Sequence, residues 1–348
     1  MKTRKTATRM LCALALITAA PMAGARDQVL AVGSSTVYPF ATVVAEHIGK
    51  TTDFKTPQVE AWGSGGGIKF FCRGVGVGEA DIALASREMV ASELQQCQEN
   101  GVSDILGLRF GWDGIILATA GKGPHLRLTL KDLFLALGRR IPDPNGEEQL
   151  VPNPYKSWKE TNPTLPDVPI QVYGPPVTSG TRDVLVERGL IRGCKSFDWL
   201  SALSQSDPER FRQVCGAIRE DGAYTSTGEN DNLIVRKVGE SDQAVGIFGF
   251  SYYDQNRDKL QASEIEGIEP TFDTIYSRDY PLARPLYIYV KAAHADSIPG
   301  LEPFLSELMD ERASGEEGYL IDRGLIPVPA PERKANAEKI RELVEKRQ

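Results

Sequence analysis

Short apolar segments alternate with amphipathic segments along most of the sequence, and this alternation constrains the fold more than any other feature. An apolar run of about four to eight residues suits a buried strand, whereas apolar residues at helical spacing suit one face of a helix. Strands that alternate with helices indicate an α/β architecture. The predicted strands are residues 28–32, 58–61, 81–85, 170–173, 244–250 and 286–290, and a longer apolar run covers 108–120.

The predicted helices follow several of these strands. One covers about residues 38–48, where Pro39 suits the first helical turn because its missing N–H would have no partner there. Others begin at Ile68 and at the Thr178–Asp183 segment, the latter continuing to about Gly189. Residues 141–169 are rich in Pro and Gly and are predicted as loop. The charged tail, residues 329–348, is predicted to be helical where it is ordered.

The first 25 residues have the layout of a secretory signal peptide. A basic start is followed by a largely apolar stretch, residues 10–20, and by the small residues Ala23-Gly24-Ala25. Such a segment is too short to span a membrane, and no later run reaches the roughly 18 apolar residues that a spanning helix needs. We therefore expect cleavage after Ala25 and a periplasmic protein without direct membrane insertion. Its length of about 323 residues suits two lobes better than one core.

The charge of the mature chain narrows the choice of partners. The whole chain has 40 Lys and Arg against 47 Asp and Glu. Four of the basic residues lie in the predicted signal peptide, so the mature formal charge is about −11. An acidic surface argues against nucleic acid and against an anionic membrane surface. Any anion site must therefore create its own local positive potential.

Four cysteines follow the predicted cleavage site and allow three pairings. Their spacing favours the pairs Cys72–Cys97 and Cys194–Cys215, each closing a local loop in an oxidising compartment. Zinc binding is the weaker alternative, because the sequence has no C-x-x-C pair and its three histidines lie far from the cysteines. We expect neither a metal nor another cofactor.

Three predicted strand ends carry a Ser, Thr and Gly cluster just before a predicted helix. The first N–H groups of a helix lack an intrahelical acceptor and lie at the positive end of its dipole. Small residues let an oxyanion approach that backbone, and hydroxyl groups add donors. A single cluster of this kind is explained by ordinary helix capping, whereas three such clusters in one chain favour a shared oxyanion site. The clusters are Ser34-Ser35-Thr36-Val37, Ser64-Gly65-Gly66 and Ser179-Gly180-Thr181, with Arg87 and Arg182 nearby as candidate bidentate donors.

These segments together resemble the periplasmic phosphate-binding family of ABC importers. The resemblance runs in order from about residue 28 to about residue 325. It is carried by G-S-S-T-V-Y-P-F at 33–40, G-S-G-G-G-I-K at 63–69, D-I-A-L-A-S-R at 81–87, T-S-G-T-R-D at 178–183, G-E-N-D at 228–231 and A-V-G-I-F-G at 244–249.

The resemblance implies a two-lobed periplasmic-binding-protein type II fold with two crossing hinge segments. Lobe 1 is expected to contain residues 26–117 plus 286–348, and lobe 2 residues 118–285. The implied function is capture of inorganic phosphate between the lobes and delivery to the permease subunits of an ABC importer, by a monomer that is not an enzyme. The predicted phosphate-binding residues are Ser35, Thr36, Val37, Ser64, Arg87, Ser179, Gly180, Thr181 and Arg182.

Two departures from the family pattern concern selectivity. The family's usual aspartate, which accepts the hydrogen of hydrogen phosphate, matches Arg87 here, and its usual arginine matches Pro175. Arg182 is the candidate substitute for that arginine. A buried carboxylate rejects sulfate because sulfate brings no hydrogen to donate. The candidate acceptors in this chain are therefore Asp113 and Glu88, each of which also suits a structural role.

Three alternative functions stay open at this point. A hydrolase is disfavoured because the sequence has no G-x-S-x-G motif and its histidines are scattered. A receptor for sulfate, molybdate or another oxyanion would keep the fold and change the ligand. A sensor or an adhesin could use the same scaffold.

Overall fold

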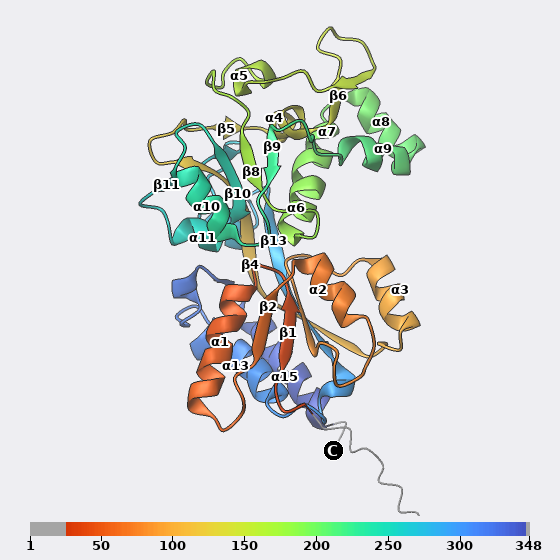
Figure 1. Cartoon of the computed structure of the whole chain (residues 1–348), viewed down its shortest axis with the longest axis vertical. Coiled ribbons are helices and arrows are strands. Elements are labelled where there is room, and N and C mark those ends of the chain that lie inside the picture. The colour runs from red at the N-terminus through yellow and green to blue at the C-terminus, as the bar shows by residue number, and fades with distance from the viewer. Residues whose placement is uncertain (1–25, 346–348) are drawn as a thin grey trace, which may run out of the picture.

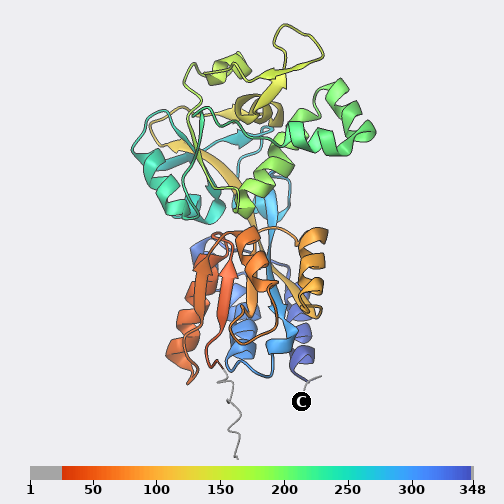
Figure 2. The ribbon, with the colours of Figure 1, turned by 45° about the vertical axis from the view of Figure 1, so that its right-hand side comes forward.

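The computed structural model describes residues 26–345, so the predicted signal peptide, residues 1–25, lies outside the described residues. Within the described part, the chain forms two α/β lobes arranged end to end, as two views that differ by 45° show (Figures 1 and 2). Helices lie against the sheet of each lobe. The predicted fold class, an α/β protein with two lobes, is confirmed.

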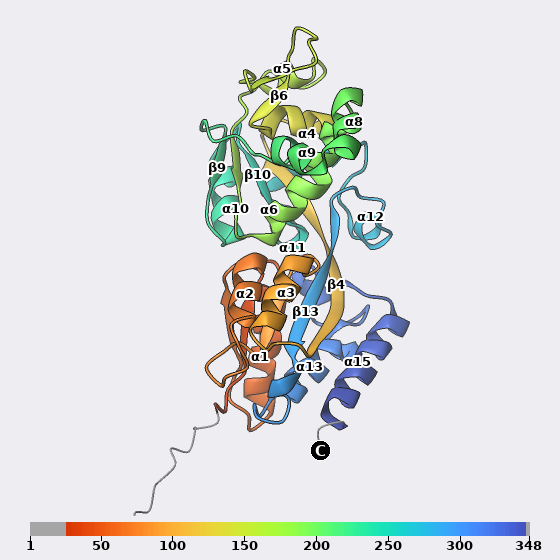
Figure 3. The same ribbon diagram turned by 90° about the vertical axis from the view of Figure 1, so that its right-hand side faces the viewer.

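One long buried strand passes through both lobes. β4 (Ile105–Ala120) pairs antiparallel with β13 (Ala283–Lys291) along its first part. Along its last part it pairs antiparallel with β10 (Val245–Gly249). A strand that is buried on both faces reads as a nearly continuous apolar run, which is the pattern seen in residues 108–120. Figure 3 shows β4 and β13 side by side where they connect the lobes.

The first lobe contains one sheet in the order β2-β1-β3-β13-β4. β1 is parallel to β2 and β3, whereas β13 runs antiparallel to β3. Its further strands are β1 (Leu30–Gly33), β2 (Gln58–Ala61), β3 (Ile82–Ala85) and β14 (Ile326–Pro327). Its α-helices are α1 (Tyr38–Thr51), α2 (Ser64–Phe71), α3 (Ala91–Glu99), α13 (Leu301–Met309), α14 (Glu311–Ser314) and α15 (Ala330–Glu345), and short 3-10 turns cover Ala292–His294 and Ile321–Arg323.

In the second lobe, the sheet continues from β4 in the order β10-β8-β9, with β11 also paired to β4. Its further strands are β5 (Arg127–Leu128), β6 (Arg140–Pro142), β7 (Leu150–Pro152), β8 (Val172–Gly174), β9 (Tyr224–Ser226), β11 (Leu260–Ala262) and β12 (Glu264–Ile265). Its α-helices are α4 (Leu130–Leu137), α5 (Trp158–Thr161), α6 (Gly180–Val184), α7 (Ile191–Cys194), α8 (Asp198–Ser206), α9 (Pro208–Cys215), α10 (Asp231–Gly239), α11 (Phe250–Asp254) and α12 (Phe272–Tyr276), and a π-helical turn, Leu185–Leu190, joins α6 to α7.

Each lobe has its own apolar core. Along β4, Phe110 packs into a first-lobe core and Ile115 into the second-lobe core. Along β13, the corresponding change falls between Ala283 and Leu286. The residues between these positions therefore lie at the junction of the lobes. The lobe limits expected at residues 117–118 and 285–286 stay predictions.

The main errors in the predicted elements fall where glycine or proline was read as a break. The second helix begins at Ser64 and not at Ile68, so the glycine-rich segment is itself helical. A Cβ at Gly67 would lie 2.3 Å from the Cα of Gly33, so this close approach of helix and strand requires glycine. The predicted loop at 141–169 contains the hairpin of β6 and β7 and the short α5.

Both disulfides join the pairs that the spacing favoured, Cys72–Cys97 in the first lobe and Cys194–Cys215 in the second. Among residues 26–345, no helix combines the length and the apolar character needed to span a membrane.

Candidate functional site

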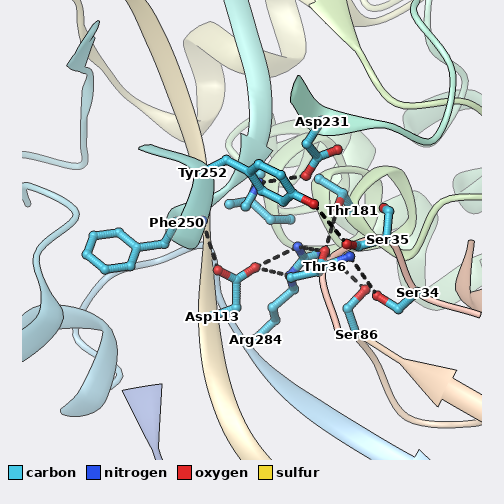
Figure 4. A network of polar contacts seen from close by, with 12 residues as sticks. Ser34, Ser35, Thr36, Ser86, Asp113, Thr181, Asp231, Phe250, Tyr252 and Arg284 are labelled. Atoms are coloured by element: carbon cyan, nitrogen blue, oxygen red, sulfur yellow. Dashed lines mark hydrogen bonds and ion pairs between the residues drawn. The ribbon is translucent and has the colours of Figure 1, made fainter. Parts of the chain in front are cut away.

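The side chain of Arg284 lies at the junction of the two lobes. Arg284 is the second residue of β13 and is 0% exposed. Its partner in the strand ladder is Asp113 of β4, which is also buried. Nε and Nη2 of Arg284 donate to Oδ2 of Asp113 at 2.9 and 2.6 Å, as Figure 4 shows. The two connecting strands thus hold a buried ion pair between the lobes.

The remaining N–H groups of Arg284 contact hydroxyl groups from both lobes. Nη2 donates to Oγ1 of Thr36, just before α1, at 2.7 Å. Nη1 donates to Oγ1 of Thr181, in the first turn of α6, at 2.9 Å. Nη1 also lies 3.3 Å from Oγ of Ser86, which follows β3. A single guanidinium group therefore connects two of the predicted clusters, those of Thr36 and Thr181, with the segment that follows β3.

The loop before α1 places Thr36 in this network. Oγ of Ser34 accepts from the N–H groups of Thr36 and Val37 at 3.2 and 3.4 Å, which fixes the turn that leads into the helix. The Val37 N–H, which the family resemblance assigns to the ligand, thus has a protein acceptor here. The carbonyl of Ser35 accepts from the hydroxyl of Tyr252, on α11 of the other lobe, at 3.1 Å.

The clusters that begin α2 and α6 lie in direct contact. Oγ of Ser64 accepts from the N–H of Ser86 at 3.1 Å. A Cβ on Gly180 would lie 2.3 Å from Oγ of Ser64 and 2.4 Å from Oγ of Ser86, so only glycine fits at this contact. Ser179 caps α6, because its Oγ accepts from the N–H of Thr181 at 3.2 Å. The three predicted clusters therefore meet between the lobes.

The two arginines predicted to assist these clusters have other neighbours. Nε of Arg87 donates to Asp183 of the other lobe at 2.6 Å, and its Nη atoms donate to both carboxylate oxygens of Glu93. Burial opposes a high pKa for Arg87, but these carboxylates outweigh burial and raise it. Arg182 lies over the Tyr224 ring at 4.9 Å. Direct contact of either arginine with a ligand stays a prediction.

Of the two carboxyl groups considered as proton acceptors, only Asp113 belongs to the network. Its Oδ1 accepts from the N–H of Phe250 at 2.8 Å, so both oxygens have donors. Burial raises the pKa of Asp113, and the Arg284 guanidinium opposes that rise. Glu88 instead accepts from the hydroxyl of Tyr287 at 2.6 Å on an exposed part of the surface.

Sequence reasoning missed Arg284, Ser86, Asp231 and Tyr252. Arg284 and Asp113 had a recognisable signal, because each is a charged residue beside a long apolar run and the two charges have opposite signs. Asp231 is the first residue of α10, is fully buried, and accepts from the N–H of Gly249 through Oδ2 at 3.3 Å. Burial raises the pKa of Asp231 to about 7.

This arrangement suits a small tetrahedral oxyanion. Hydroxyl groups, helix N-terminal N–H groups and one guanidinium converge at a point from which water is largely excluded. The donors are neutral except for Arg284, whose charge is balanced by Asp113, so the site does not require a basic protein surface. Within residues 26–345, no group of three or more His, Cys, Asp or Glu residues could hold a metal ion.

Comparison with known proteins gives consistent similarities. Residues 18–312 match the family model of a PBP superfamily domain. Protein SphX of Synechocystis sp. is 32% identical over 306 residues, which cover 85% of this chain and 77% of that protein. The phosphate-binding protein PstS of Staphylococcus saprophyticus is 24% identical over 319 residues, which cover 90% of this chain and 84% of that protein.

A solved structure supports the same grouping. The crystal structure of a possible phosphate binding protein from Planctomyces limnophilus has a TM-score of 0.59 and 26% sequence identity. The similarity covers 91% of this chain and 98% of that protein. It thus includes both lobes and the strands that connect them.

Proposed function

The chain belongs to the PBP superfamily, and we propose that it is an extracytoplasmic solute-binding protein that captures inorganic phosphate between its lobes and delivers it to an ABC importer. The similar protein from S. saprophyticus is named a phosphate-binding protein, and that from P. limnophilus is a possible phosphate binding protein. Export through a signal peptide that is cleaved after Ala25, and a monomeric state, belong to the same proposal.

The convergence of three strand-to-helix loops on Arg284 carries this proposal. Thr36 and Ser86 approach from the first lobe and Thr181 from the second, all within 3.3 Å of the guanidinium. A ligand that takes hydrogen bonds from these groups would connect the lobes, and closure would follow from its binding. The small residues around it limit the ligand to a small anion.

The proposed ligand contacts are the hydroxyl and N–H donors of the three clusters together with Arg284. From the predicted set, we retain Ser35, Thr36, Val37, Ser64, Ser179, Gly180 and Thr181. Arg87 is proposed to act through its pair with Asp183, which joins the lobes at 2.6 Å, and not through direct contact. Arg182, above the Tyr224 ring, is proposed to lie outside the contact set.

The proposed motion uses the two connecting strands as a hinge. Lobe 1 would consist of residues 26–117 plus 286–348, and lobe 2 of residues 118–285. Because Arg284 and Asp113 sit on the hinge itself, the main charged group of the site keeps its position while the lobes move around it. Binding and release, rather than bond cleavage, is therefore the proposed activity.

The test is calorimetric titration of the mature, ligand-stripped protein with inorganic phosphate, and separately with sulfate. We expect tight binding of phosphate and much weaker binding of sulfate. The variant Thr181→Ala should bind phosphate about 5- to 150-fold more weakly, because a buried anion would lose a donor worth roughly 1–3 kcal/mol.

The matched control is Thr225→Ala, which removes the same group from an exposed position on the same lobe. This variant should bind phosphate as the wild type does. Absence of phosphate binding by the wild-type protein, or equal losses in both variants, would contradict the proposed function. Tight sulfate binding with no phosphate binding would retain the site and change its ligand.

A further inference from the structure

A π-helical turn connects one of the three clusters to the strand that carries Arg284. The turn, Leu185–Leu190, follows α6 without a break, and α6 holds Thr181 in its first turn. Within the π-helical turn, Nη1 of Arg188 donates to the carbonyl of Ala283 at 2.5 Å. That carbonyl belongs to the peptide bond that joins Ala283 to Arg284 in β13. Arg188 therefore sets the position of the backbone next to the main charged group of the site.

Arg188 makes this contact at a cost. Its side chain is half-buried, and its bonding partner is a neutral carbonyl and not a carboxylate. The pKa of Arg188 is lowered by burial and by the nearby charge of Arg192, whereas Glu88 opposes this lowering. A guanidinium that gives up water without gaining a carboxylate is costly, and π-helical turns are rare and frequently lie at functional sites. Both observations indicate that the contact with β13 has a role beyond packing.

The chain that enters β13 is fixed to the second lobe by further bonds. The carbonyl of Leu282 accepts from the N–H of Ile115 at 3.0 Å, and the N–H of Ala283 donates to the carbonyl of Tyr280 at 3.0 Å. The hydroxyl of Tyr280 donates to the carbonyl of Ile115 at 2.9 Å. All four residues pack in the second-lobe core. The backbone next to Arg284 is thus part of that lobe.

The ion-pair partner of Arg284 is fixed to the same lobe. Oδ1 of Asp113 accepts from the N–H of Phe250, the first residue of α11, at 2.8 Å, as Figure 4 shows. Phe250 packs in the second-lobe core. From the first lobe, the guanidinium is instead contacted by the hydroxyl groups of Thr36 and Ser86. These two contacts can separate when the lobes move apart, whereas the bonds to the second lobe lie within its packed core.

The irregular part of β13 begins just after Arg284. Pro285 has no N–H and cannot donate to the strand ladder. The register with β4 shifts between Leu286 and Tyr287, and Leu286 already packs in a first-lobe core. An irregularity of this kind bends a strand and interrupts its pairing. We therefore expect β13 to bend on the first-lobe side of Arg284 when the lobes open.

We infer that Arg188 is a positioning residue that holds Arg284 on the second lobe, so that Arg284, Asp113 and Thr181 stay together when the lobes open. These three residues are called the second-lobe half of the site. The inference rests on the proposed function, since it assigns how that same site is assembled. Phosphate first binds to the second-lobe half, and the first lobe adds its donors, such as Ser64, on closure.

The inference predicts which rate changes in the variant Arg188→Met. Displacement of bound radiolabelled phosphate by excess unlabelled phosphate gives the dissociation rate, and calorimetry near pH 7.5 gives the dissociation constant. Dividing the first by the second gives the association rate. The association rate should fall at least about fivefold, because Arg284 is no longer held in place before phosphate arrives, while the dissociation rate stays within about twofold of the wild type. An unchanged association rate overturns the inference, even where urea unfolding shows lower stability.

The matched control is Arg192→Met, which removes an equal charge one turn further along the same helical segment. Nη1 of Arg192 donates to the carbonyl of Pro281 at 3.3 Å, further from Arg284 along the chain. Its association rate should stay within about twofold of the wild type. Repeating both measurements at about 0.5 M NaCl separates placement from long-range attraction, because salt screens the attraction between phosphate and a distant charge. A loss in Arg188→Met that disappears at this salt concentration, or that is equal in the two variants, overturns the inference.

A second pair of variants tests the two halves of the site without changing Arg188. Thr181→Ala should mainly lower the association rate, whereas Ser64→Ala should mainly raise the dissociation rate, each by at least about fivefold. A change in the same rate for both variants overturns the inference. The proposed function has a separate criterion. A wild-type protein that does not bind phosphate overturns that function, whereas tight phosphate binding with an unchanged association rate in Arg188→Met overturns only this inference.

Discussion

Replacing Arg284 with methionine removes the charge at the junction of the lobes and leaves Asp113 without its partner. Asp113 would keep only backbone donors such as the Phe250 N–H, in a position that is 2% exposed. Breaking a buried pair in this way typically costs about 3–5 kcal/mol of unfolding free energy. We expect a loss in this range near pH 7.5 for the ligand-free protein.

The loss of unfolding free energy in Arg284→Met should depend on pH, because the unpaired Asp113 carboxylate can take up a proton and become neutral. Without Arg284 its pKa in the folded state rises further above the unfolded value of about 3.9, so the unfolded state binds fewer protons and stability falls as pH rises. Protonating the Asp113 carboxylate costs about 1.4 kcal/mol for each pH unit above the unfolded pKa. The variant loses no more stability than this cost, because a protonated Asp113 needs no charged partner. The loss of unfolding free energy is therefore limited to about 5 kcal/mol near pH 7.5 and about 2 kcal/mol near pH 5.5. The loss in Arg284→Met should therefore shrink by as much as about 3 kcal/mol on acidification.

Urea unfolding of phosphate-free protein, followed by tryptophan fluorescence, measures this change at both pH values. The control is the double variant Arg284→Met with Asp113→Asn, in which the unpaired group no longer ionises. It should be more stable than the single variant by at least about 2 kcal/mol near pH 7.5, and the cost relative to the wild type should vary less with pH. A single variant within about 1 kcal/mol of the wild type, or a double variant that is worse, would refute this account of the ion pair.

Three further predictions concern the contacts that hold the lobes together and the disulfide of the second lobe. Arg87→Ala and Asp183→Ala should each weaken phosphate binding by a similar factor, because each breaks the same ion pair between the lobes, and the double variant should lose little more. If calorimetry finds weaker binding for Arg87→Ala alone, Arg87 contacts the ligand directly. Tyr252→Phe removes the hydroxyl that donates to the Ser35 carbonyl at 3.1 Å and should weaken phosphate binding about 2- to 13-fold, the equivalent of roughly 0.5–1.5 kcal/mol; unchanged affinity would show that this bond does not stabilise the closed form. Replacing both cysteines of the pair Cys194–Cys215 with serine should lower the unfolding free energy by about 3 kcal/mol, since the bond closes a loop with a sequence separation of 21; an unchanged urea midpoint would contradict this.

Much of the fold was available from local patterns in the sequence. The alternation of apolar runs and amphipathic segments predicted the α/β architecture, and the spacing of cysteines favoured the observed pairs. The three Ser, Thr and Gly clusters do meet between the lobes. Such features can be recognised in the sequence because helix starts, the alternation of side chains along a strand and short disulfide loops depend on residues that are close in sequence.

The elements that were predicted wrongly show the limit of local patterns. A glycine-rich segment was expected to precede a helix, but it forms the first turn of α2 because Gly67 packs against Gly33. The helix that follows Ser179 was expected to continue to about Gly189, and it does so, but the sequence did not indicate that its part from Leu185 to Leu190 is a π-helical turn. In the first case, a contact with a strand far away in the chain outweighs the local preference.

By itself, the sequence determined the class of fold and the strand-to-helix loops that supply neutral donors, and it favoured the disulfide pairs without deciding them, since each depends on short-range periodicity or chemistry. Only the tertiary structure decided which charges enter the site. Arg284 reaches Asp113 across 171 positions and Thr36 across 248 positions, and Asp231 acquires its raised pKa from burial beside them. Burial and pairing of charges are properties of the packed molecule, because the dielectric and the partners that set them exist only after the lobes have folded.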